Sequence, residues 1–162
     1  TLMVPFAVIM IPLFIIVRTL GITNSLWGII LPMIPHAYGI FLFRQFYLGM
    51  PRELEESAML DGLSHYGTFF RIVAPLSKAI AVTLAVAFFV ANWNNYLWPL
   101  IVTQKRSLWV IQIAIANFRG ERTVAWNLVL AASCITIVPT IIIFFIFQRY
   151  IVEGIKVSGI KM

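Results

Sequence analysis

The chain of 162 residues is 61% hydrophobic and only 11% charged, and its mean hydropathy is +0.95. A water-soluble fold of this size cannot bury so much apolar surface, so we predict a membrane protein surrounded by lipid. The formal net charge of +6 does not indicate a nucleic-acid partner, because the basic residues stand singly at the edges of apolar segments.

Four apolar segments are candidates for membrane crossings, since a helix needs about 20 predominantly apolar residues to span a bilayer. They are residues 2–20, 25–46, 76–101 and 126–150. Each is expected to be helical, because a helix satisfies its own backbone in lipid and the alternation of a barrel strand is absent. The predicted fold class is an all-α membrane protein, a polytopic transmembrane helix bundle.

The start of the chain does not have the pattern of a signal peptide, because it lacks both a basic leader and a small-residue cleavage site. No methionine precedes Thr1, and we expect that an N-terminal portion is missing. Four crossings place segment 47–75 and the tail after Tyr150 on one side. Counted together with the ends of the adjoining crossings, this side carries seven basic residues, Arg44, Arg52, Arg71, Lys78, Arg149, Lys156 and Lys161, against five on the other, Arg18, Lys105, Arg106, Arg119 and Arg122. The positive-inside rule therefore predicts that this side is cytoplasmic.

The stretch RELEESAMLDG, residues 52–62, holds four of the six acidic residues of the chain. Proline at position 51 suits the first turn of a helix, and the glutamates lie where the positive end of the helix dipole stabilises them. Gly62 is the expected terminator. At about 100° per residue, Ala58 and Gly62 stack one turn apart, so one face is nearly bare backbone.

A helix of this kind suits docking into a groove on another protein. It is a poor membrane-surface anchor, because anchors separate a basic face from a bulky apolar face. A solvated connecting helix is the alternative that the pattern alone leaves open.

Segment 56–75 resembles the cytoplasmic EAA signature of ATP-binding-cassette importer permeases, which runs E-A-A, three residues, G, nine residues and I-x-L-P. The residues at the matching spacings are Glu56, Ser57, Ala58, Gly62, Ile72 and Pro75. Ser57 replaces the first alanine of the signature and Ala74 replaces the leucine, and both replacements are small or apolar.

The resemblance extends along the chain to the second permease subunit of carbohydrate importers of the maltose-transporter type. The similar stretches are GIFLFRQFYLGMPRELEESAMLDGLSHYGTFFRIVAPLSKA, NWNNYLWPLIV and FQRYIVEGIKVSGIKM. The resemblance implies that residues 1–162 are the transmembrane domain of an importer in the inner membrane, lacking its N-terminal crossings, with a cytoplasmic coupling segment at 47–75. A permease for amino acids or peptides is the nearest alternative.

The same resemblance implies several partners: a second permease subunit, two ATPase subunits and an extracytoplasmic sugar-binding protein. ATP and Mg²⁺ would be bound by the ATPases, since this chain has no G-x-x-x-x-G-K-[ST] loop, and we expect no cofactor on it and no enzymatic activity of its own. The implied roles are close approach to the ATPase at Ala58 and Gly62, polar pairing at Glu56 and Asp61, and return into the membrane at Ile72 and Pro75.

A polar cluster near the outer end of the third segment is the candidate substrate path. Asn92 and Asn95 carry amides that can exchange hydrogen bonds with sugar hydroxyls, and Trp93 can cover the C–H face of a sugar. An interfacial aromatic belt would explain Trp93 and Trp98 without any ligand, and we favour the belt for Trp98.

Other chemistry is less well supported by the sequence. We expect no metal site, because His36 stands alone in an apolar span and His65 has no second histidine or cysteine at ligand spacing. Glu56, Asp61 and His65 would be the acid and base groups of a membrane-embedded hydrolase. A scaffold protein whose acidic helix binds a partner without moving it is a further alternative.

Overall fold

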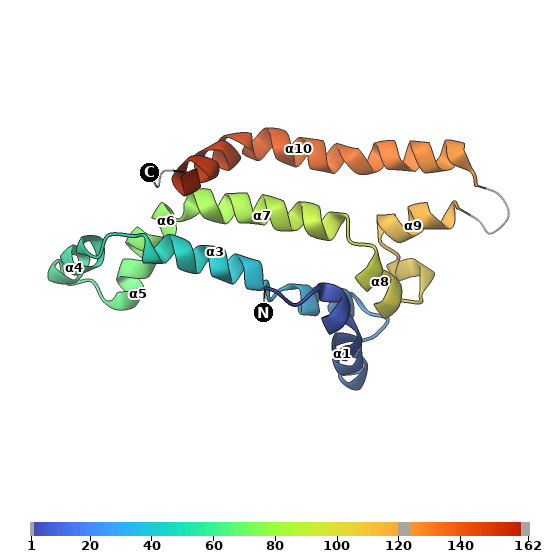
Figure 1. Ribbon diagram of the computed structural model, residues 1–162, viewed down its shortest axis with the longest axis horizontal. Coiled ribbons are helices and arrows are strands. Elements are labelled where there is room, and N and C mark those ends of the chain that lie inside the picture. Colours follow the sequence, from blue (N-terminus) through green and yellow to red (C-terminus); the bar gives the residue numbers. More distant parts are fainter. Residues whose placement is uncertain (1, 120–123, 160–162) are drawn as a thin grey trace. The chain divides into compact units, whose positions relative to one another are not determined.

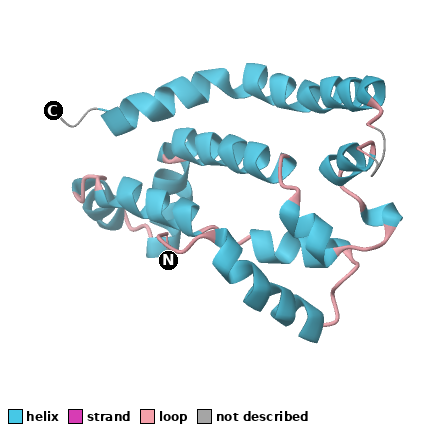
Figure 2. Ribbon diagram, turned by 45° about the vertical axis from the view of Figure 1, so that its right-hand side comes forward, coloured by secondary structure: helices cyan, strands magenta, loops and turns pink. Residues whose placement is uncertain are grey.

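The computed structural model describes residues 2–119 and 124–159, with side chains as far as Tyr150. Over this part of the chain the protein consists of helices joined by short loops, and the only β pairing is an isolated bridge between Arg119 and Val124 (Figure 2). The predicted all-α fold class is confirmed. The backbone divides into two compact units, Thr1–Ala37 with Val90–Ile142 and Tyr38–Phe89 with Ile143–Met162.

The first unit is built around the buried indole of Trp98. Its elements are α1 (Phe6–Thr19), α2 (Leu26–Ile30), the 3₁₀ turn η1 (Leu31–Met33), α8 (Leu97–Val102), the 3₁₀ turn η3 (Arg106–Leu108), α9 (Ile111–Asn117) and the first part of α10 (Trp126–Gly159). Trp98 packs with Val17 and Val102, and its exposed fraction is 0%. Helices α1, α2 and α8 therefore share one core.

In the loop before α2, Asn24 has a left-handed backbone conformation and forms hydrogen bonds to the residues at the end of α8 and just after it. Asn24 has a φ of 53°, its N–H donates to the carbonyl oxygen of Val102 at 3.0 Å, and its side-chain oxygen accepts from the N–H groups of Gln104 and Lys105. Ser25 then caps α2 by accepting from the N–H of Gly28 at 3.2 Å. These bonds join the start of α2 to the end of α8.

The second unit contains the acidic segment. Its elements are α3 (Ala37–Leu48), α4 (Glu53–Leu60), α5 (His65–Thr68), the π-helical turn η2 (Phe69–Val73), α6 (Ala74–Leu76), most of α7 (Lys78–Trp93) and the last part of α10 (Figure 1). Side-chain hydrogen bonds join these elements: Tyr47 Oη donates to Ser77 Oγ at 3.4 Å, and Thr83 Oγ1 donates to the carbonyl oxygen of Tyr150 at 3.1 Å.

Within the part of the chain that the structure describes, two stretches are long and apolar enough to cross a membrane, Leu26–Leu48 with 23 residues and Trp126–Tyr150 with 25 residues. They match the second and fourth predicted crossings. His65–Leu76 and Lys78–Trp93 meet at a bend of 68° and count as a third span only if the bent pair is one crossing.

The other two predicted crossings are shorter than the sequence suggested. Helix α1 has 14 residues, fewer than a bilayer requires. The third predicted segment is interrupted, because α7 ends at Trp93 and the helix resumes only at Leu97. Asn94 and Asn95 mark this break in the sequence, but the apolar residues on both sides led to the prediction of one continuous crossing.

Candidate functional site

The acidic helix α4 begins and ends where its sequence predicts. The N–H groups of Glu55 and Glu56 donate to the carbonyl oxygen of Arg52 at 2.9 and 3.0 Å. At the other end, the N–H of Gly62 donates to Met59 and that of Leu63 to Ala58, both at 3.0 Å. Gly62 has a φ of +83°, a left-handed conformation that glycine adopts without steric cost. The prediction that Gly62 ends the helix is confirmed.

Ala58 and Gly62 have different surroundings, although they lie one turn apart. Ala58 is only 2% exposed, because α4 packs against α5 within the same chain. Gly62 is exposed, and a Cβ added there would have no heavy atom within 4 Å. The predicted bare face of Ala58 and Gly62 is therefore not a single exposed surface, because Ala58 is buried where α4 packs on α5.

The other residues of the signature lie at α4 and in the elements η2 and α6 that lead back towards α7. Glu56, Ser57 and Asp61 are exposed, and Ser57 Oγ donates to the carbonyl oxygen of Leu54 at 3.2 Å. Ile72 lies half-buried in the π-helical turn η2, and Pro75 is exposed in α6. The acidic groups and the left-handed turn at Gly62 are thus accessible to a partner, while η2 is partly covered by the chain itself.

Two bulky side chains beside this turn were missed by the sequence reasoning. Leu60 is 89% exposed and Tyr66 is 81% exposed, and they lie on either side of Gly62 in the chain. The sequence does contain an indication of them, because large apolar residues stand close to the glycine that ends a polar helix. Leu60 and Tyr66 are thus little covered by the chain itself and are accessible for contact with another protein.

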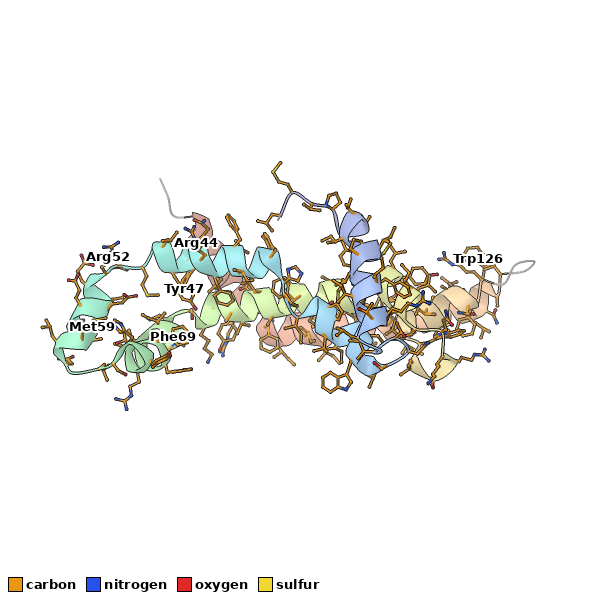
Figure 3. The ribbon with its side chains drawn as sticks, turned by 90° about the horizontal axis from the view of Figure 1, so that it is seen from below. Arg44, Tyr47, Arg52, Met59, Phe69 and Trp126 are labelled. Atoms are coloured by element: carbon orange, nitrogen blue, oxygen red, sulfur yellow. The ribbon has the colours of Figure 1, made fainter. Side chains whose placement is uncertain are left out.

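A hollow of about 320 Å³ lies beside α4 and is here called the α4 hollow. It is lined by Tyr47, Met50, Glu55, Met59, His65, Thr68, Phe69 and Val73. Tyr47, Met59 and Phe69, which Figure 3 labels, come from α3, α4 and η2. Of the three residues considered for a hydrolase, only His65 lines this hollow, so the structure does not bring Glu56, Asp61 and His65 together there.

The candidate substrate residues are partly brought together in the first unit. Asn92 and Asn95 line a second hollow of about 320 Å³, here called the asparagine hollow, with Trp98 and apolar residues around them. Asn95 also supports the backbone, because its side-chain oxygen accepts from the N–H of Trp98 at 3.4 Å. Trp93 does not line this hollow, and its Nε1 donates to the carbonyl oxygen of Thr136 at 3.1 Å.

The interpretation of Trp98 as a residue of an interfacial aromatic belt is wrong. Its side chain is fully buried, and its Nε1 donates to the carbonyl oxygen of Gly28 at 3.1 Å. The physical reason is the turn after α7, which directs α8 back against α1 and α2. The indole is therefore a core group that forms one wall of the asparagine hollow.

The profile of the family described as binding-protein-dependent transport system inner membrane component matches residues 1–157. The chain belongs to this family. The expected resemblance is thus confirmed, and the inner membrane component has apolar helices that fit a membrane location.

Curated relatives of this inner membrane component share more than a third of its sequence. The arabinooligosaccharides transport system permease protein of Halalkalibacterium halodurans is 38% identical over 160 residues, covering 99% of this chain and 57% of that protein. The lactose transport system permease protein of Rhizobium radiobacter is 39% identical, covering 95% and 56%. The sn-glycerol-3-phosphate transport system permease protein of Salmonella typhi is 39% identical, covering 96% and 56%.

The fold is also that of a solved transporter. A crystal structure of a bacterial ABC transporter involved in the import of the acidic polysaccharide alginate matches with a TM-score of 0.65 at 22% identity, covering 93% of this chain and 56% of the solved one. The chain spans a little over half the length of the curated relatives described above.

Proposed function

We propose that the chain is the transmembrane part of the permease subunit of an ATP-driven carbohydrate importer. Family membership supports the permease role, and the relatives named for arabinooligosaccharides and lactose support carbohydrate as the substrate class. The asparagine hollow adds chemical support, because the amides of Asn92 and Asn95 can both donate to and accept from sugar hydroxyls.

The coupling segment 47–75 is proposed to face the cytoplasm, as is the C-terminus, and α4 is proposed to dock on an ATPase subunit. Glu56, Ser57 and Asp61 would exchange hydrogen bonds and charge interactions with the groove of the ATPase. Leu60 and Tyr66 would supply the apolar contacts. The role of Ala58 is different from the one first expected, because it holds α4 on α5 and so makes the docking unit rigid.

Movement would then pass from the ATPases into the membrane through the return helix. Closing of the ATPase dimer on ATP and Mg²⁺ displaces α4, and the packed α5, η2 and α6 carry the displacement past Ile72 and Pro75 to the start of α7. The two states of the permease must be biased by both ATP and substrate. The complete importer would include a second permease subunit, two ATPase subunits and an extracytoplasmic sugar-binding protein.

The observation that carries this proposal is the exposed left-handed turn at Gly62, bordered by exposed Leu60 and Tyr66. It is tested with Gly62→Trp in the full-length permease, co-expressed with its ATPase, by measuring how much ATPase is recovered with the permease and how much sugar enters vesicles. We expect both quantities to fall strongly, because a bulky residue would block docking and strain the backbone by about 1 kcal/mol or more.

The matched control is Gly67→Ala, because the nearest atoms to a Cβ at Gly67 are 3.5 Å away and the residue lies in α5. This variant should retain ATPase recovery and uptake. Normal recovery of the ATPase and normal uptake with Gly62→Trp would refute the coupling assignment.

A further inference from the structure

Two cationic side chains meet at one aromatic ring where α7 and α10 contact each other in the second unit. Lys78 Nζ lies 5.7 Å from the ring centroid of Tyr150, and the guanidinium carbon of Arg149 lies 4.6 Å from it. Arg149 Nη2 also donates to the hydroxyl oxygen of Tyr150 at 2.7 Å. We call these three residues the Tyr150 cluster.

The backbone that carries the cluster is fixed by hydrogen bonds between helices. Thr83, in the second turn of α7, donates from Oγ1 to the carbonyl oxygen of Tyr150. Ser77, directly before Lys78, accepts from Tyr47 of α3. These bonds fix the backbone on both sides of the cluster, from which the side chains of Lys78 and Arg149 extend to the ring of Tyr150.

The cluster is accessible and carries net positive charge. Lys78 and Arg149 are exposed, and Tyr150 is half-buried. Among the side chains of residues 2–119 and 124–150, no carboxylate forms an ion pair with either cation. Two cations and a hydroxyl around one ring make a site that suits an anion with several acceptor oxygens, as a phosphate has.

The position of the cluster selects the source of that phosphate. The apolar stretch Trp126–Tyr150 ends at the cluster, and the apolar helix Lys78–Trp93 begins there. Lys, Arg and Tyr at the end of a membrane span lie at the level of the lipid headgroups, with their apolar parts against the acyl region. A phosphate at this level that extends into two acyl chains can use both the cations and the apolar helix surfaces next to them.

We propose that Lys78, Arg149 and Tyr150 bind the phosphate of an anionic phospholipid. The arginine supplies hydrogen bonds to two phosphate oxygens, the lysine supplies a point charge, and the ring of Tyr150 holds both cations in place. The site concerns the lipid around the permease and does not depend on the transported solute, so it goes beyond the proposed function.

The test is lipid binding by the full-length permease in its purified complex. Fluorescently labelled phosphatidylglycerol is titrated against the complex in neutral detergent, and its anisotropy gives the apparent affinity. For the double variant Lys78→Gln with Arg149→Gln we expect a loss of affinity of at least about tenfold, because two charge-assisted contacts are removed. Tyr150→Phe, which keeps the ring, should lose less.

Two controls separate a defined site from general basic charge. Arg52→Gln with Arg71→Gln removes the same charge from exposed positions of the same unit and should leave the affinity within about twofold. Lys78→Arg with Arg149→Lys keeps the charge and should retain most of the binding, which guards against a folding defect in the glutamine variant.

Competition identifies the ligand. Unlabelled phosphatidylglycerol should displace the probe, and phosphatidylcholine should not. Equal losses in both double glutamine variants would overturn the proposal, as would competition by inorganic phosphate at the concentration at which phosphatidylglycerol competes. Because no transport is measured, the outcome is independent of whether the chain imports a carbohydrate.

Discussion

Trp98 donates a hydrogen bond from its indole to the carbonyl oxygen of Gly28, a residue 70 positions earlier in the chain. The pair requires both residue types. A Cβ at Gly28 would overlap the carbonyl oxygen of Ile22, so glycine is needed for the close approach of α2 to the preceding loop. The fully buried indole then fills the space between α1, α2 and α8.

Replacing Trp98 by Phe should destabilise the first unit. The change leaves the buried carbonyl of Gly28 without its donor and removes ring volume from the core, which together cost about 2 kcal/mol. The measurement is the thermal unfolding midpoint of the purified full-length permease. Trp126→Phe is the control, because Trp126 is 62% exposed, and an equal shift in the two variants would contradict the core role of Trp98.

The three neighbouring asparagines should respond differently to alanine substitution. Asn92→Ala should reduce sugar uptake more than it lowers thermal stability, because Asn92 is exposed and lines the asparagine hollow. Asn95→Ala should lower both, by about 1 kcal/mol in stability, because its side chain also accepts from the N–H of Trp98. Asn94 does not line this hollow, and Asn94→Ala should transport normally.

The measurements are sugar uptake in vesicles that contain the complete importer and the thermal unfolding midpoint of each of the three alanine variants. If Asn92→Ala and Asn94→Ala both transport at the wild-type rate, the asparagine hollow is not part of the substrate path.

Enlarging Ala58 should disturb the coupling segment from within. Ala58→Leu adds a bulky side chain to a position that is almost fully buried between α4 and α5, at a cost of about 1 to 3 kcal/mol. We expect faster cleavage of segment 49–64 by protease in the permease without its ATPase. Leu60→Ser, at the exposed position, should leave this cleavage unchanged but lower ATPase recovery.

A reversed result, with faster cleavage in Leu60→Ser and none in Ala58→Leu, would show that the inward and outward faces of α4 have been assigned wrongly.

The orientation in the membrane is tested with single cysteines in a Cys134→Ala background, because Cys134 is the only cysteine of the chain and is exposed. Ser64 and Ser107 are exposed and lie in the two segments predicted to face opposite sides. An impermeant thiol reagent added to intact cells should label position 107 and spare position 64. Labelling of position 64 under these conditions would reverse the proposed topology.

The parts of the structure that follow from short-range chemistry were predictable from the sequence. Gly62 ends α4 because a left-handed residue closes the helix, and this depends only on its neighbours. The crossing predicted at 25–46 corresponds to Leu26–Leu48, and the one at 126–150 to Trp126–Tyr150, because an apolar run of sufficient length is visible without any tertiary contact.

The parts that depend on distant contacts were not predictable in the same way. The burial of Trp98 requires Gly28 to lie beside it, and nothing near Trp98 in the sequence indicates this. The inward orientation of Ala58 depends on how α5 folds back after Gly62. A small residue on a helix can allow close packing either by another protein or by another helix of the same chain, and the sequence pattern is the same in both cases.

The π-helical turn Phe69–Val73 has a consequence for how the chain tolerates changes in length. Its hydrogen bonds close over five residues instead of four, so it holds one residue more than an α-helical turn. Deleting one residue within Phe69–Val73 should therefore convert it to ordinary α-helix and leave the helices on both sides facing as before. The same deletion inside α7 would rotate every later side chain by about 100° about the helix axis. A deletion in segment 69–73 is thus expected to preserve the facing of the membrane helix that follows, although at 69–71 it would shorten the nine-residue spacing between Gly62 and Ile72.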